Sequence, residues 1–192
     1  NFYKGALKIS DTKNNKAQAS NQKLSEFVDF LEQISSTQVT FNIKKLREDL
    51  AKGLYFDSSI PQGYGIGSSG ALVAAIYDRY ANNRITILEN LTRDKLLRLK
   101  EIFGQMESFF HGKSSGLDPL NSYLSLPILI NSSESIQPTG IPSQNLDGRG
   151  AVFLLDSGSS RETGPLMSIF LKNMEHEKFN KMMKEKFNTI TD

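Results

Sequence analysis

The stretch from Ile60 to Ala71 constrains the fold more than any other part of the chain. It lies between a predicted strand, Leu54–Ile60, and a predicted helix, Ser69–Ala81. Glycines at alternate positions let the backbone turn tightly and bring its N–H groups close to a ligand. The helix that follows would aim unpaired N–H groups and its positive dipole end at the loop, which suits a phosphate. The stretch predicts a phosphate-binding loop, with a purely structural glycine-rich turn as the alternative.

Two other nucleotide loops must be weighed against this interpretation. Gly65, Gly67 and Gly70 match a dinucleotide fingerprint, and Glu89 follows at about the expected 20 residues. In that fingerprint the strand runs directly into the first glycine, and a central parallel strand is nearly all apolar. Here residues 61–64 intervene and the preceding strand is half polar, so the dinucleotide interpretation is disfavoured. A Walker A loop is excluded more firmly, because no Gly-Lys-Ser/Thr follows the glycines.

Composition points to no macromolecular partner. The 192 residues carry 23 Lys+Arg against 21 Asp+Glu, and a net charge of +2 gives no general reason to expect nucleic acid or membrane. No run approaches the roughly 20 apolar residues of a membrane span. The chain has no cysteine, so a disulfide framework is absent and a reducing, cytoplasmic location is expected. It starts at Asn1 without Met or a signal-like segment, so we expect a piece of a longer protein.

Hydrophobic periodicity indicates a mixture of helices and strands around the loop. Strands are predicted at Gly5–Ile9, Tyr123–Ile130 and Ala151–Leu155; helices at Leu24–Ile34, Ile43–Lys52 (with Gly53 as its C-cap), Thr92 to His111 and Leu166–Phe187; and loops at Ser10–Lys23 and Asn131–Gly150, the latter a loop or hairpin.

A second set of polar residues lies at the end of the predicted helix that starts near Thr92. Glu107 and His111 are four residues apart and share a helix face. Asp118 follows a glycine-containing turn that would fold it back toward Glu107. Paired carboxylates beside a phosphate loop predict a Mg²⁺ ligand and a general base. An exposed helical pair and a helix-capping aspartate are the alternatives.

A third set, Arg161 and Thr163, follows the predicted strand that ends at Leu155. A guanidinium and a hydroxyl on a strand-end loop are suited to hold a substrate carboxylate or phosphate. A surface ion pair and a helix N-cap explain the same two residues equally well.

In these three places the sequence resembles the GHMP kinase superfamily, and the second motif is most similar to the mevalonate kinases within it. The signature Pro-x-x-x-Gly-Leu-Gly-Ser-Ser-Ala corresponds to residues 61–70. The pattern of a helix Glu, then His-Gly and Pro-Ser-Gly-x-Asp, corresponds to Glu107, His111–Gly112 and Ser114–Asp118. The Arg-x-Thr after a buried strand corresponds to Arg161–Thr163.

The resemblance implies roles for individual residues. ATP phosphates would be held by the loop and helix start, namely Pro61, Gly63, Gly65, Gly67, Ser68 and Ser69. Ser69 and Glu107 would coordinate Mg²⁺, and Asp118 would polarise or deprotonate the acceptor hydroxyl. The residues toward the substrate would be His111, Ser115, Arg161 and Thr163.

The resemblance also implies a fold and an activity. The fold is α+β, with a two-layer N-terminal domain like domain 2 of ribosomal protein S5 over residues 1–150 and the start of an α+β C-terminal domain over residues 151–192. The activity is ATP- and Mg²⁺-dependent phosphoryl transfer to a small-molecule hydroxyl, with mevalonate and isoprenoid biosynthesis favoured. Other acceptors (phosphomevalonate, homoserine, a sugar), a non-catalytic nucleotide-binding module and a homodimer remain open.

The sequence departs from the superfamily pattern at several points. The superfamily's N-terminal Lys would fall before Asn1, and its C-terminal glycine-rich motif would fall after Asp192. Gly70 stands where Ala is usual, and Ser114 where Pro is usual. Both replacements are expected to be mild, with Ser114 loosening the turn before Asp118.

Overall fold

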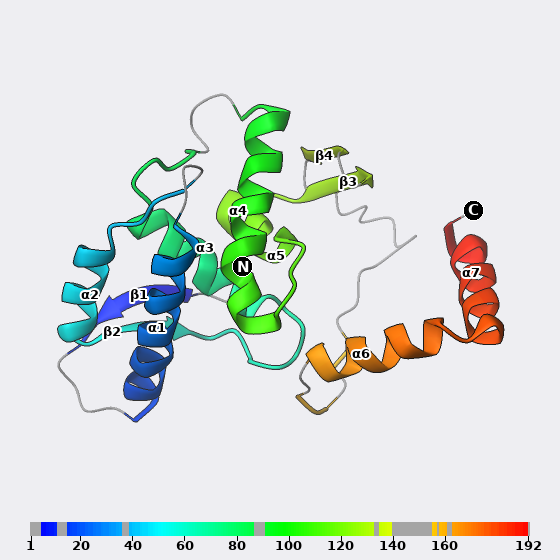
Figure 1. Cartoon of the computed structure of the whole chain (residues 1–192), viewed down its shortest axis with the longest axis horizontal. Helices are drawn as coiled ribbons and strands as arrows, with labels where there is room; N and C mark the ends of the chain where they lie inside the picture. Colours follow the sequence, from blue (N-terminus) through cyan, green and yellow to red (C-terminus); the bar gives the residue numbers. More distant parts are fainter. Residues whose placement is uncertain are drawn as a thin grey trace, which may run out of the picture.

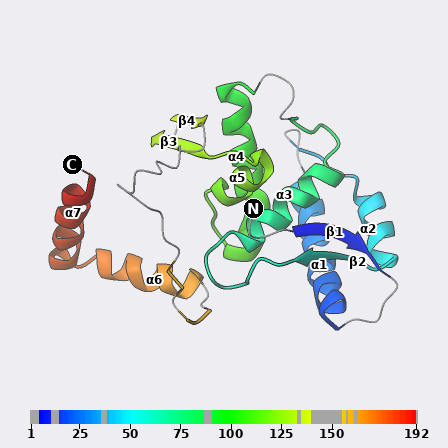
Figure 2. The same ribbon diagram turned by 180° about the vertical axis from the view of Figure 1, so that it is seen from behind.

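A computed structural model describes residues 5–10, 15–35, 39–86, 91–132, 135–139, 155–156, 158–160 and 163–191. Within these residues the chain is α+β (Figures 1 and 2). In chain order the elements are β1 Gly5–Ile9, α1 Asn15–Ile34, α2 Ile43–Ala51, β2 Leu54–Ser58, α3 Ser68–Tyr80, α4 Arg93–His111, α5 Leu117–Leu124, β3 Ile128–Ser132, β4 Ser135–Pro138, α6 Thr163–Met174 and α7 Glu177–Thr191. None of the helices in this described part has the length and apolar character needed to cross a bilayer.

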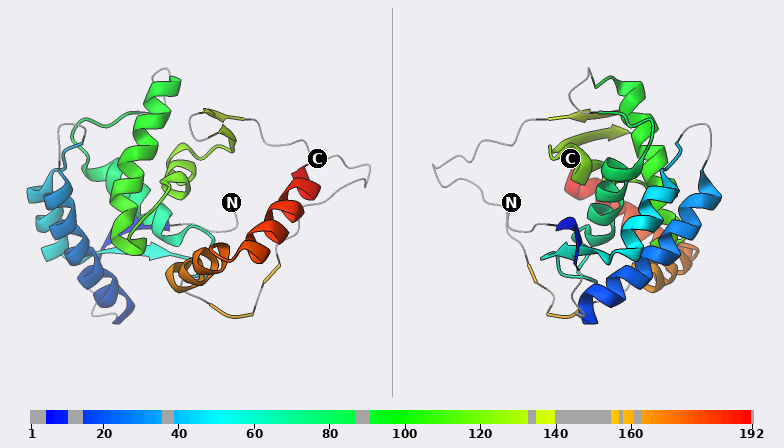
Figure 3. Two further views of the ribbon diagram at one scale, coloured as in Figure 1. Left: turned by 45° about the vertical axis from the view of Figure 1, so that its right-hand side comes forward. Right: turned by 90° about the vertical axis from the view of Figure 1, so that its left-hand side faces the viewer.

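The described residues form two small antiparallel sheets (Figure 3). In the first, β1 pairs with β2, with Gly5 opposite Ser58 and Ile9 opposite Leu54. The helices α1 and α2 contact β2, and α3 contacts β1. In the second, β3 and β4 form a hairpin whose register shifts between Ile130 and Ser132. The first sheet matters most for the site, because β2 leads directly into the glycine loop.

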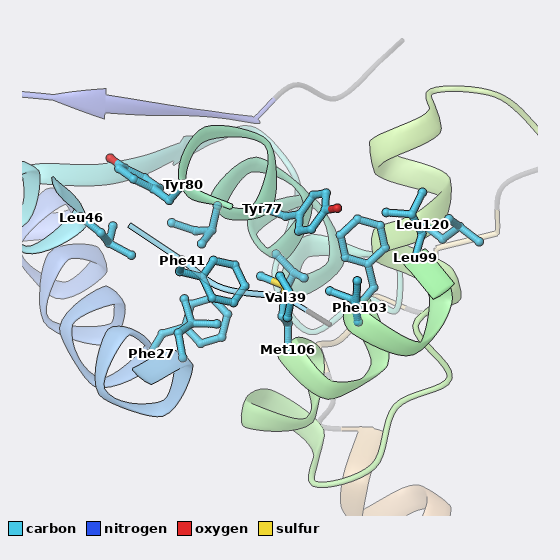
Figure 4. Packing of buried hydrophobic residues seen from close by; sticks show 14 of the residues in the cluster. Phe27, Val39, Phe41, Leu46, Tyr77, Tyr80, Leu99, Phe103, Met106 and Leu120 are labelled. Carbon is cyan, nitrogen blue, oxygen red and sulfur yellow. The ribbon is translucent and has the colours of Figure 1, made fainter. Parts of the chain in front are cut away.

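The hydrophobic core lies between α1, α3 and α4, with α5 closing one side (Figure 4). Three aromatic rings join three helices there: Tyr77 from α3, Phe103 from α4 and Tyr123 from α5. Their ring centroids lie 5.0 to 5.5 Å apart in edge-on arrangements, each worth about 0.5–1.5 kcal/mol beyond burial. Burial raises the pKa of Tyr123 to about 12, so its hydroxyl stays neutral. This trio fixes the three helices whose ends form the site.

Several predicted elements are confirmed, among them the strand at Gly5–Ile9 and the helix that follows Thr92. The Lys95 N–H donates to Thr92 Oγ1 at 3.4 Å, which is an N-cap bond. Gly53 has φ +85° after the C-cap Lys52, where a Cβ would lie 2.3 Å from a backbone oxygen. A glycine is therefore required at the end of α2.

The loop predicted at Ser10–Lys23 is wrong over Asn15–Lys23, which forms the first half of α1. Lys, Gln and Ala are good helix formers, and Ala17 is buried. Asn21 contributes a tertiary contact, because its Nδ2 donates to the carbonyls of Leu50 at 3.1 Å and Leu54 at 2.6 Å. A polar stretch is helical here because it docks on the end of α2 and the start of β2.

The strand predicted at Tyr123–Ile130 is wrong over its first residues, because Tyr123 belongs to α5 and the strand begins at Ile128. The Tyr123 hydroxyl donates to the Ile85 carbonyl at 2.8 Å and its ring joins the aromatic trio, so tertiary contacts decide its conformation. The single helix predicted over residues 166–187 is two helices, α6 and α7. The predicted strand at residues 151–155 lies outside the described residues except for its last residue, and the whole stretch from 140 to 150 lies outside them.

A buried carboxylate joins α2 to α3. Asp49 is 1% exposed and accepts from Lys45 Nζ at 2.7 Å, Tyr80 Oη at 2.9 Å and Arg79 Nη2 at 3.3 Å. Burial by itself raises the pKa of Asp49. The hydrogen bonds from Lys45 and Tyr80 and the charges of Lys45 and Arg79 outweigh it, so the pKa is lowered from the ordinary value of 3.8. The charged form of Asp49 therefore stabilises the fold.

We expect Asp49→Ala to lower the free energy of unfolding by about 3 kcal/mol near pH 7, because the buried Tyr80 hydroxyl loses its acceptor and two cations lose their partner. Since the folded pKa is depressed, this stabilisation is complete above the unfolded pKa of 3.8 and is lost as pH falls through the folded pKa. Urea unfolding of the parent chain and of Asp49→Ala, at pH values from about 7 to about 3, measures this difference in the free energy of unfolding. Asp57→Ala, which breaks the exposed pair with Lys8, should change the free energy of unfolding far less, because solvent screens exposed ion pairs. A pH-independent difference for Asp49→Ala would contradict the assignment.

Candidate functional site

The glycine loop joins the end of β2 to the start of α3 (Figure 2). Gly63, Gly65 and Gly67 have φ values of +78°, +68° and +76°, which L side chains rarely adopt. Gly67 is the N-cap of α3 and offers no side-chain cap to the N–H groups of the first turn. A Cβ on Gly65 would meet nothing within 4 Å. The loop is thus open toward solvent and ends on an uncapped helix start. The residues predicted to hold phosphates lie in it or directly after it: Pro61, Gly63, Gly65, Gly67, Ser68 and Ser69.

The first turn of α3 is tied to the end of α4 by a polar cluster. Ser69 Oγ donates to Glu107 Oε1 at 3.0 Å and lies 3.0 Å from His111 Nε2. Since the one Ser69 hydroxyl proton goes to Glu107, the second contact requires His111 Nε2–H to donate to Ser69 Oγ. Glu107 is 3% exposed. Glu107 and His111, one helical turn apart on α4, therefore both contact the Ser69 hydroxyl of α3. Because Glu107 is buried, the two residues are not the exposed helical pair that was the alternative interpretation.

Asp118 lies in the first turn of α5, two residues after the N-cap Gly116. It is exposed, and it faces the glycine loop: a Cβ placed on Gly67 would lie 3.8 Å from Asp118 Cβ, Cγ and Oδ2. A carboxylate therefore stands beside the last glycine before α3. Gly116, rather than Asp118, caps α5.

Close helix packing sets this arrangement. A Cβ on the buried Gly70 would lie 2.8 Å from the backbone carbon and Cβ of Asp118 and from Pro119 N. Backbone atoms cannot yield as a flexible side chain does. In this chain the absent Cβ of Gly70 therefore lets α3 approach α5 closely, and an alanine does not fit without a shift of the backbone. That the replacement is mild relative to the superfamily pattern stays a prediction.

Ser114 was expected to loosen the turn before Asp118, and this expectation is wrong. The Ser114 side chain hydrogen-bonds within the turn and to α4. Ser114 Oγ donates to Glu107 Oε2, and the Gly116 N–H donates to Ser114 Oγ at 3.0 Å. The turn is therefore hydrogen-bonded to α4 through one hydroxyl.

Of the remaining predicted substrate residues, Ser115 and Thr163 belong to the described part of the chain. Ser115 is exposed, and its Oγ accepts from the Leu117 N–H at 3.4 Å. Ser115 lines a surface hollow along α4 together with Lys100 and Lys113, and no residue of the glycine loop lines that hollow. Thr163 is the first residue of α6. Arg161 lies outside the described residues.

The cluster offers oxygen ligands of the kind that Mg²⁺ prefers, namely the Glu107 carboxylate and the Ser69 hydroxyl. Among the described residues, no three His, Cys, Asp or Glu side chains group closely enough to hold a metal by themselves. Mg²⁺ is commonly bound by one or two carboxylates together with substrate phosphates and water. The donor set therefore fits a cation shared with a phosphate in the adjoining loop.

Residues 32–125, just under half of the chain, match the family model for the GHMP kinases N terminal domain. The matched region contains the glycine loop, Glu107 and Asp118, and it excludes Arg161 and Thr163. The match and the α+β fold support the GHMP kinase superfamily, a class of small-molecule kinases. The match does not distinguish the mevalonate kinases from other members. No curated protein and no solved structure matches the chain.

We expect Gly70→Ala to lower the free energy of unfolding by about 1–3 kcal/mol, because overpacking against the Asp118–Pro119 backbone outweighs the better helix propensity of alanine. Thermal and urea unfolding measure this change. Gly164→Ala is the matched control, since Gly164 is also helical and its Cβ would meet nothing within 4 Å. The control should be neutral or slightly stabilising. An equal effect of both substitutions would contradict the close approach of α3 to α5.

Proposed function

We propose that this chain contains the nucleotide-binding domain of an ATP-dependent small-molecule kinase that phosphorylates a hydroxyl group. The observation that carries the proposal is the bond from Ser69 Oγ to Glu107 Oε1, beside a glycine loop that ends on an uncapped helix. This bond lies within the region that matches the GHMP kinases N terminal domain. The domain extends over about residues 1–150 in this proposal, and residues 151–192 begin a second domain.

In this proposal the backbone N–H groups from Gly65 to Ser69 bind the ATP phosphates. The three glycines with positive φ leave the loop backbone exposed, and the dipole of α3 adds positive potential at the end of the loop. Ser69 Oγ and Glu107 would hold Mg²⁺, which supplies neutralisation of the phosphate charge when bound. His111 holds the Ser69 hydroxyl in place through its Nε2–H.

Asp118 is the proposed general base. It accepts the proton of the acceptor hydroxyl while the hydroxyl oxygen forms its bond to the γ-phosphorus. The bond from that phosphorus to the β,γ-bridging oxygen breaks, and ADP leaves. The position of Asp118 opposite Gly67 supports this role, because a base must lie beside the transferring group. Positioning and charge neutralisation supply most of the catalysis in such reactions.

Mevalonate is the acceptor that we propose to test first. Its support is the run from His111 to Asp118, which resembles the mevalonate kinase pattern apart from Ser114. Ser115, Arg161 and Thr163 would contribute to the acceptor site. Phosphomevalonate, homoserine and sugars form the comparison panel.

Asp118→Asn should reduce kcat by about 10²- to 10⁴-fold, because the amide cannot accept the hydroxyl proton. ADP release by the full-length protein, measured with each acceptor of the panel, is the assay. Asp94→Asn is the matched control, since Asp94 is an exposed carboxylate in the first turn of α4, at the other end of that helix from Glu107. It should leave kcat near the parent value.

Two outcomes would contradict parts of the proposal. Undiminished turnover by Asp118→Asn would remove the role of that residue. ATP binding without ADP release for any acceptor would favour a non-catalytic nucleotide-binding module.

A further inference from the structure

We propose that Ser114 is a positioning residue that fixes the carboxylate of Glu107 and couples it to the turn carrying Asp118. The inference rests on the proposed function, and it assigns a role to a residue whose type departs from the proline of the superfamily pattern. Ser114 lies between the end of α4 and the start of α5 and is half-buried.

The two oxygens of the Glu107 carboxylate are held from different directions. Oε1 accepts from the Ser69 hydroxyl at 3.0 Å, and Oε2 accepts from the Ser114 hydroxyl. A buried carboxylate needs such bonds, since an unpaired charge away from water is costly. With both oxygens held, the plane of the carboxylate is fixed and Oε1 is the oxygen directed toward α3.

This orientation bears on cation binding. A cation that approached Glu107 from the glycine loop would meet Oε1 beside Ser69 Oγ, while Oε2 stays on Ser114. Glu107 would then act as a ligand through one oxygen. Groups that orient a ligand in this way commonly change metal affinity by about 10- to 100-fold when they are removed.

The same hydroxyl also organises the turn. The Gly116 N–H donates to Ser114 Oγ at 3.0 Å. Gly116 itself packs tightly on α4, because a Cβ there would lie 2.1 Å from the Lys100 carbonyl oxygen. Asp118 follows two residues later, so one side chain joins the proposed cation ligand to the proposed base. A proline at position 114 has no hydroxyl and cannot make either bond.

The test measures cation affinity rather than turnover. Binding of Mn²⁺ to the full chain, saturated with a non-hydrolysable ATP analogue, is followed by the electron paramagnetic resonance signal of free Mn²⁺. We expect Ser114→Ala to raise the Mn²⁺ dissociation constant by about 10- to 100-fold, and Ser114→Thr, which keeps the hydroxyl, to restore most of the affinity. Ser108→Ala is the matched control, because the Ser108 hydroxyl donates to the Gln105 carbonyl of its own helix.

Circular dichroism melting checks that the variants fold. If Ser114→Ala does not fold, Ser114→Cys is used, since a thiol of similar size is a weak hydrogen-bond donor, and the same loss of affinity is expected. Unchanged Mn²⁺ affinity in the folded variant, alongside a loss in Glu107→Gln, overturns the role of Ser114 and leaves the proposed function intact. Failure of the unmodified chain to bind Mn²⁺ with the nucleotide overturns both.

Discussion

The site depends on how closely the first turn of α3 approaches the start of α5. Gly70 allows this approach, because any Cβ there would collide with the backbone at Asp118 and Pro119. Gly116 likewise allows the start of α5 to approach α4, because a Cβ on Gly116 would collide with the Lys100 carbonyl oxygen. The start of α5 therefore lies against the first turn of α3 and against the middle of α4 at distances that only glycine permits. The glycine loop, the buried carboxylate and the exposed carboxylate are brought together as a result.

A polar cluster and an aromatic cluster stabilise this meeting point. Glu107 is buried, and both oxygens of its carboxyl group accept hydrogen bonds, one from a hydroxyl of α3 and one from a hydroxyl of the turn before α5. In the hydrophobic core, the rings of Tyr77, Phe103 and Tyr123 connect α3, α4 and α5 through edge-on contacts. Functional groups need rigid support to hold their geometry, and here that support comes from helix packing rather than from long loops.

Local sequence signals predicted many of the elements correctly. The Thr92 cap, the end of α4 near His111 and the left-handed glycines follow from short-range chemistry, and the structure agrees with them. The errors occurred where distant contacts decide the conformation. Asn21 lies in a helix because it bonds the backbone at the start of β2, and Tyr123 lies in a helix because its ring and hydroxyl reach α3 and Ile85. The bonding partners of both residues lie far away in the sequence, so the local pattern does not reveal these contacts.

The sequence by itself determined the tight turning of the glycine loop and the shared face of Glu107 and His111, since the conformational freedom of achiral glycine and the helical repeat are local properties. It also indicated the region that matches the GHMP kinases N terminal domain. Only the tertiary structure decided that Ser69 reaches a carboxylate 38 residues away, that Asp118 faces Gly67, and that Ser114 bonds Glu107 rather than loosening its turn. These contacts depend on distances between helices, which are fixed by the packing of buried side chains across the core and by Gly70 and Gly116, where no Cβ fits.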